Sequence, residues 1–172
     1  MNFSNNHGNA AVIVIVIFLA GIVMFIFPLK TIADKKDETV MLEAQKIITE
    51  QVNKWRTKGV ITSEDIDNLT LSLGATGAAF DVELKVLVLD TNPTKKSTGS
   101  TITIGNNVYY VDYTTQIEDK LPYIIKEGDI ISAAAIRIDE SIAEQIENIL
   151  FRSNANSSSR VEETAVCTST AK

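Results

Sequence analysis

Hydrophobic and polar positions divide the chain into one long apolar segment and a patterned remainder. Residues 10–29 are all apolar, Gly21 and Pro28 included, and carry no charge. A 20-residue helix spans about 30 Å, the thickness of the hydrocarbon core of a bilayer. The segment is apolar on every side, unlike an amphipathic surface helix. The pattern predicts a transmembrane helix over residues 10–29, ended or kinked at Pro28, after an N-terminal tail of residues 1–9.

A cleaved secretory signal is the alternative interpretation of this segment. Such signals begin with a basic region and end at a small-residue cleavage site. Residues 1–9 contain no Lys or Arg, and residues 31–33 offer only Thr-Ile-Ala, so we expect a retained single-span anchor. Lys30, Lys35 and Lys36 follow the span, and the positive-inside rule alone would keep the rest of the chain in the cytoplasm. The charge pattern leaves the orientation open.

A second periodic segment follows the apolar one. Over residues 34–58 the apolar positions recur at helical spacing and form a single stripe, and Gly59 can end the helix. We expect a stalk helix (residues 30–59) that packs this stripe on a head domain. The stripe consists of Val40, Ala44, Ile47, Ile48, Val52 and Trp55.

Residues 60–151 alternate between strand-like and helix-like patterns and predict the head domain. The pattern predicts strands over 81–90, 101–104, 108–113 and 130–138, a helix over 63–74 capped by Thr62 or Ser63, a helical turn over 115–121, and an amphipathic helix over 140–151. Residues 152–172 are rich in Ser, Asn and Thr, which predicts a disordered tail. The expected fold is α+β: a long N-terminal helix, transmembrane then amphipathic, packed on a small antiparallel sheet of three or four strands, as in pilins.

Composition and charge exclude several classes of function. The 172 residues carry a net charge of −6, and the 16 Lys and Arg are scattered, so no basic face is available for nucleic acid. Cys167 is the single cysteine and His7 the single histidine. A disulfide, a thiolate metal site and catalysis by a Ser–His or Cys–His pair in the head are therefore not expected. We predict no cofactor and no enzymatic activity.

Three residue groups invite a chemical interpretation, and each has a simpler structural one. The pairs Glu64/Asp65 and Glu118/Asp119 suit a helix first turn and a polar face better than acid–base work. Residues 74–77, Gly-Ala-Thr-Gly, lack the Lys-Ser/Thr of a phosphate loop. Four aspartates flank strands and could hold Ca²⁺ if clustered, but no contiguous ligand loop supports a metal site. These aspartates are Asp81, Asp90, Asp112 and Asp129.

Aromatic residues gather in the predicted hairpin. Tyr109, Tyr110 and Tyr113 could form a binding platform, although cross-strand packing is the more common use of such a cluster. The polar segment 91–100 could also contact a ligand. These two features carry the alternative hypothesis of a membrane-anchored binding or sensory module.

Residues 7–12, His-Gly-Asn-Ala-Ala-Val, stand directly before and within the start of the apolar run. They resemble the start of TadE-like pseudopilins of tight-adherence (Flp) pilus systems, which are relatives of type IV pilins. In that family a Gly precedes the processing point, and a Glu is the fifth residue after it. The resemblance implies a processing site between Gly8 and Asn9. Ile13 stands where the family has its Glu, which is thought to neutralise a neighbouring subunit's N-terminal amine during assembly.

Short motifs farther along extend the resemblance to roughly residues 7–138. Residues 60–62, 73–77, 80–84 and 127–129 look like segments of TadE-like or pilus-associated membrane proteins of Gram-positive, clostridial-type bacteria. The resemblance implies a structural subunit of a pilus, secretion or DNA-transfer apparatus, anchored in the cell membrane by one span with its head outside. Its expected partners are the lipid bilayer and other pilin-like subunits. The anchor and assembly residues we expect are Val12, Ile13, Val14, Ile17 and Phe18.

Overall fold

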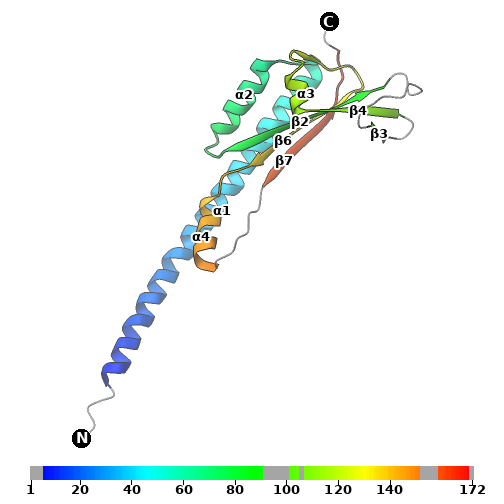
Figure 1. The fold of residues 1–172 in the computed structure, drawn as a ribbon. Coiled ribbons are helices and arrows are strands. Elements are labelled where there is room, and N and C mark those ends of the chain that lie inside the picture. The colour runs from blue at the N-terminus through cyan, green and yellow to red at the C-terminus, as the bar shows by residue number, and fades with distance from the viewer. Residues whose placement is uncertain (1–5, 91–100, 105–106, 152–158, 171–172) are drawn as a thin grey trace. The chain divides into compact units, whose positions relative to one another are not determined.

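The computed structural model of the chain describes residues 6–90, 101–104, 107–151 and 159–170 (Figure 1). The first element is α1 (Asn6–Lys58), one continuous helix. The chain forms two compact units, Met1–Glu38 with Glu140–Ala155, and Thr39–Asp139 with Asn156–Lys172. We refer to the first as the anchor unit and to the second as the head unit. The two halves of α1 belong to different units.

The head unit is built on a five-stranded antiparallel sheet in the order β3-β4-β2-β6-β7. The strands are β2 (Phe80–Leu89), β3 (Thr101–Ile104), β4 (Asn107–Tyr113), β6 (Ile130–Arg137) and β7 (Arg160–Val166). A separate two-stranded sheet pairs β1 (Val60–Ile61) with β5 (Tyr123–Ile124). The α+β class and the antiparallel sheet agree with the prediction, and the sheet has one strand more than expected.

The core of the head unit lies between one face of the sheet and two helices, the later half of α1 and α2 (Ser63–Gly74). Alternate residues of the central strands face these helices, because side chains alternate along a strand. In register, Leu84 of β2 lies opposite Ala133 of β6. The fully buried members of this core include Ala44, Ile48, Val52, Trp55, Leu69, Leu73, Leu84, Val86, Ile131 and Ala133.

Local sequence explains the ends of the helices in the head unit. Thr62 caps α2, with its hydroxyl accepting from the backbone N–H of Asp65 at 3.3 Å. Gly59, with φ of +71°, follows α1 and turns the chain into β1. α3 (Thr114–Glu118) is the short helical turn expected between the hairpin and Pro122.

The anchor unit pairs the first part of α1 with α4 (Ile142–Phe151), which lies beside it in Figure 1. Lys30 Nζ lies 2.6 Å from Glu147 Oε1 and joins the two helices. The small residues Ala33 and Ala143 are both buried. These contacts correct the predicted boundary of the head at residue 151, since α4 groups with the N-terminal helix and not with the sheet.

Of the two outcomes predicted at Pro28, an end or a kink, the structure excludes the end: the proline removes one N–H donor, but the turns on both sides keep theirs and α1 continues. The prediction for the C-terminal tail is wrong. The tail predicted to be disordered over 152–172 contains β7, which pairs along β6 from Ile130↔Val166 to Ile136↔Arg160. β7 satisfies the backbone groups of an edge that β6 would otherwise leave unpaired.

Candidate functional site

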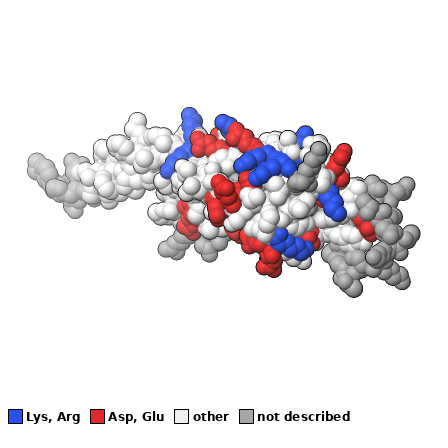
Figure 2. Space-filling model, turned by 90° about the horizontal axis from the view of Figure 1, so that it is seen from above, with Lys and Arg blue, Asp and Glu red and all other residues white. Residues whose placement is uncertain are grey.

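The largest feature of the described surface is the apolar segment of α1. Within the described residues it is the one helix long and apolar enough to cross a membrane, and its apolar stretch has no residue buried against the rest of the chain. Figure 2 shows this segment without charged side chains, whereas positive and negative groups are interspersed on the head. The predicted anchor residues are all more than half exposed: Val12, Ile13, Val14, Ile17 and Phe18.

The proposed processing residues lie at the start of the same helix. Gly8 and Asn9 are in the first turns of α1, and the structure describes only their backbone. Ile13, at the position where TadE-like pseudopilins have Glu, is 58% exposed and apolar. The described part of α1 from residue 10 to residue 29 therefore offers an apolar surface with no carboxylate.

The predicted stalk residues lie on the buried side of α1. Ala44, Ile48 and Trp55 are completely buried in the core of the head, and Ile47 packs against it partly exposed. Val40, one turn before Ala44, is 5% exposed. Leu42 on the same helix is 65% exposed, which shows how narrow the buried stripe is.

The three tyrosines do not form one platform. Tyr109 is 8% exposed and packs with Leu87 and Val111 in a small cluster on the sheet. Tyr110 points to the other side of β4 and donates a hydrogen bond from its hydroxyl to Asp90. Tyr113 alone of the three is largely exposed, at 52%. Segment 91–100, the other predicted contact surface, lies outside the described residues.

Tyr113 borders a groove of about 490 Å³ on the face of the sheet opposite the helices. Its floor is made by short side chains of β6, since Ala134 lies between Glu83 of β2 and Glu162 of β7. Ser132 lies two residues before Ala134 on β6, opposite Lys85 of β2. Long side chains of β2 and β7 thus flank the short side chains of β6, which lies between them.

The groove is lined by two acidic side chains, Glu83 and Glu162, and two basic ones, Lys85 and Arg160, so its formal charges balance. Arg160 donates to Glu83 over 2.7 Å and to Glu162 over 3.2 Å, and its side chain is 44% exposed. The hydroxyl of Ser132 donates to Glu162 over 2.7 Å and, with Arg160, holds the pKa of that carboxyl below its usual range against partial burial. Glu162 is therefore ionised at neutral pH and cannot serve as a general acid. The groove suits an uncharged polar ligand better than an ion.

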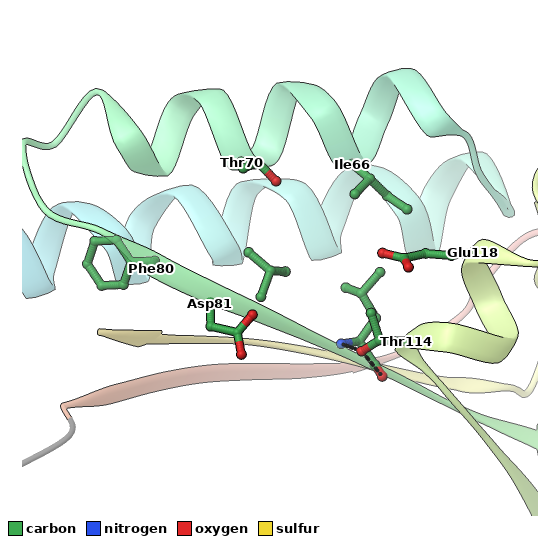
Figure 3. A pocket seen from close by; sticks show the side chains of 8 residues that line it. Ile66, Thr70, Phe80, Asp81, Thr114 and Glu118 are labelled. Carbon is green, nitrogen blue, oxygen red and sulfur yellow. Dashed lines mark hydrogen bonds between the residues drawn. The ribbon is translucent and has the colours of Figure 1, made fainter. Parts of the chain in front are cut away.

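A smaller pocket of about 190 Å³ lies where α2, β2 and α3 meet (Figure 3). Ile66 and Thr70 reach it from α2, and Asp81 and Glu118 border it. Thr114 accepts from the backbone N–H of Leu84 at 2.8 Å, which fixes its hydroxyl against the strand. The described lining contains no His, Lys or Cys that could act as base or nucleophile beside these groups.

Besides Asp90, which pairs with Tyr110, two more of the strand-flanking aspartates have structural partners. Asp129 is 2% exposed and accepts from the backbone N–H groups of Leu89 and Lys126, both at 2.8 Å. Asp112 accepts from the hydroxyl of Tyr123 at 2.8 Å. Within the ranges that the structure describes, no three His, Cys, Asp or Glu side chains gather as a metal site would require.

The groove depends on residues that the sequence pattern did not single out. Arg160 and Glu162 belong to a segment whose Ser-, Asn- and Thr-rich surroundings predicted disorder. The available signal was a weak alternation, with Val161, Ala165 and Cys167 on one side of the strand and Arg160, Glu162 and Thr164 on the other.

Comparison with known proteins does not assign this chain to a family. No protein-family model, no curated protein and no solved structure matches this chain.

Proposed function

We propose that this chain is a membrane-anchored, pilin-like structural subunit of a pilus, secretion or DNA-transfer apparatus. The observation that carries the proposal is the composition of α1. One continuous helix combines an uncovered apolar segment with a stripe that packs on the sheet of the head. Exposed apolar surface of this extent marks a membrane or protein contact.

The proposed mechanism is assembly through the apolar segment. In the bilayer, the apolar side chains of residues 10–29 hold the subunit. A helix is suited to this position because its backbone polar groups bond within the segment. In an assembled structure, the same surface packs against the equivalent helices of other subunits. The head, which we place outside the cell by resemblance to TadE-like pseudopilins, supplies further contact surface. No catalytic step is part of this proposal.

Membrane retention is the first test. We replace Val14 and Ile17 together by Asp and compare the variant with a second one in which Leu42 and Leu71 are replaced by Asp. All four side chains are more than half exposed, so neither variant removes core packing. An Asp at the centre of a span costs about 2.5–3.5 kcal/mol on insertion scales, which the control positions do not incur. We expect the first variant to leave the membrane fraction and the second to stay; retention of both rejects the anchor.

Self-association is the second test, because anchoring alone does not make a pilin-like subunit. The chain with Ile17→Cys and Cys167→Ser carries a single thiol in the apolar segment, and oxidation of intact membranes joins neighbouring copies. We expect covalent dimers whose yield does not fall when the protein is diluted with added lipid. A yield that falls in proportion to dilution reflects random collisions and contradicts assembly. Reporter fusions after residue 60 decide the side of the membrane on which the head lies.

A second candidate is a membrane-anchored binding module, favoured by the groove beside Tyr113. Its balanced lining charges and half-exposed aromatic ring suit an uncharged polar polymer such as a glycan. Saturable binding of such a polymer by the full chain, lost in Tyr113→Ala and without self-association, would support this candidate over the structural subunit.

A further inference from the structure

Helix α4 presents an unpartnered apolar face in the anchor unit. Ile142 is 52% exposed, Ile149 is 82% exposed and Leu150 is 41% exposed. These residues, together with Ile146, recur at four-, three- and one-residue intervals and so lie on one side of the helix. Exposure of this apolar face to water is unfavourable in free energy, in proportion to the apolar area that stays uncovered.

One ion pair marks the level of α4 along α1. Lys30 is the first charged residue after the apolar segment, and its Nζ lies 2.6 Å from Glu147 Oε1. In Figure 1, α4 runs beside α1 in the opposite direction, with its C-terminal end toward the N-terminus of α1. Three residues beyond Glu147, Leu150 therefore lies about 4.5 Å farther toward the apolar segment. This places the end of α4 level with the last turn of the predicted span.

From this arrangement we infer that α4 inserts the C-terminal end of its apolar face, with Ile149 and Leu150, into the bilayer interface where α1 leaves it. The inference rests on the proposed membrane anchoring and adds a second lipid contact to it. Leu29 of α1 and Leu150 of α4 are both exposed and lie close along the chain to the paired Lys30 and Glu147, so a bilayer that surrounds the end of the span meets the end of α4 as well.

The polar groups of α4 are arranged so that this embedding leaves few charges exposed to lipid. Glu147, the acidic residue nearest the span, is neutralised by Lys30. Glu144 accepts from the backbone N–H of Ser141 at 3.0 Å at the start of the helix, farther from the span. Burial of Ala33 and Ala143 fits a close approach of the two helices, so that α4 and α1 can enter the interface together.

The experiment measures lipid contact at two positions of α4 in the full chain. Cys167→Ser removes the native thiol, and a single cysteine is then introduced by Ile149→Cys or by Gln145→Cys and labelled with an environment-sensitive fluorophore. Gln145 is exposed and lies about 6 Å farther from the span, which makes it the matched control. The labelled chains are reconstituted in phosphatidylcholine–phosphatidylglycerol vesicles with and without lipids that carry a quencher below the headgroup.

We expect blue-shifted emission at position 149 and quenching at least about two-fold stronger than at position 145. Equal, water-like emission at both positions, with the protein still floating with the vesicles, overturns the inference and leaves the anchor intact. Blue-shifted emission at position 149 without quenching, together with disulfide-linked dimers of the unlabelled Ile149→Cys chain, also overturns it by showing a second copy in place of lipid. Failure of the chain to float with vesicles rejects both the anchor and this inference.

Discussion

The ammonium group of Lys54 lies 2.8 Å from the carboxylate of Asp65 and joins the end of α1 to the first turn of α2. Lys58 reaches the other carboxylate oxygen at 3.0 Å, and the hydroxyl of Thr62 donates to that same oxygen at 2.7 Å. Asp65 is 3% exposed, whereas both lysines are about half exposed. The buried carboxylate thus depends on partners that remain close to solvent.

This cluster makes the free energy of unfolding of the head fall at acidic pH. Burial alone would raise the pKa of Asp65, but hydrogen bonds from Lys54, Thr62 and Lys58 outweigh it and hold the pKa far below its usual range. In the unfolded chain the pKa of an Asp carboxyl is about 3.9. The stabilisation is therefore present above about pH 4 and is lost as the pH falls toward the lower pKa of the folded state.

We predict that Asp65→Asn lowers the free energy of unfolding at pH 7 by about 2–3 kcal/mol, through lost charged hydrogen bonds and a weakened cap. The variant should also lose less stability than the native chain between pH 4 and pH 2, because Asn does not titrate. Denaturant unfolding followed by circular dichroism in detergent micelles measures both effects. Asp67→Asn, at an exposed position of the same helix, is the control, and equal acid sensitivity of all three proteins contradicts the assignment.

The register of β7 gives a second prediction, with the same substitution at two positions of one strand. Val161 packs against the core of the head, whereas Val166 is 53% exposed on the other face. Val161→Asp should lower the free energy of unfolding by about 1–3 kcal/mol, because it places a charge without a partner at a partly buried position against the core. Val166→Asp should change it by less than about 1 kcal/mol. A one-residue slip exchanges the two faces of the strand. A larger loss of unfolding free energy for Val166→Asp than for Val161→Asp would therefore show that the register of β7 is wrong.

The narrow buried stripe of α1 gives a third prediction. Ile48→Ala should cost about 2–4 kcal/mol of unfolding free energy, since it opens a cavity at a completely buried position. Leu42→Ala removes a similar side chain from an exposed position of the same helix and should cost less than about 0.5 kcal/mol. The fluorescence of Trp55, the single tryptophan and itself a core residue, reports the unfolding of both variants. Similar losses would mean that the stripe does not face the sheet.

The local patterns of the sequence predicted most elements of the head because those patterns carry their own physical cause. Alternation of apolar residues indicated β2, the turn at residues 127–129 indicated the start of β6, and the Thr62 cap and Gly59 turn indicated where helices begin and end. The stripe from Val40 to Trp55 required an apolar partner, which the sheet provides. The groove beside Tyr113 could not be predicted in this way, since it joins residues of three strands that are far apart in the chain.

By itself the sequence determined an uncharged apolar segment, an amphipathic continuation of it and the α+β class, because length, periodicity and capping act within a few residues of one another. The tertiary structure decided that residues 160–166 form a strand, since their weak alternation becomes meaningful only beside the open edge of β6. It also decided that α4 joins the N-terminal helix through Lys30 and Glu147. A pair of charges separated so widely in the chain meets only after the fold has closed the intervening loop, and no local pattern encodes that meeting.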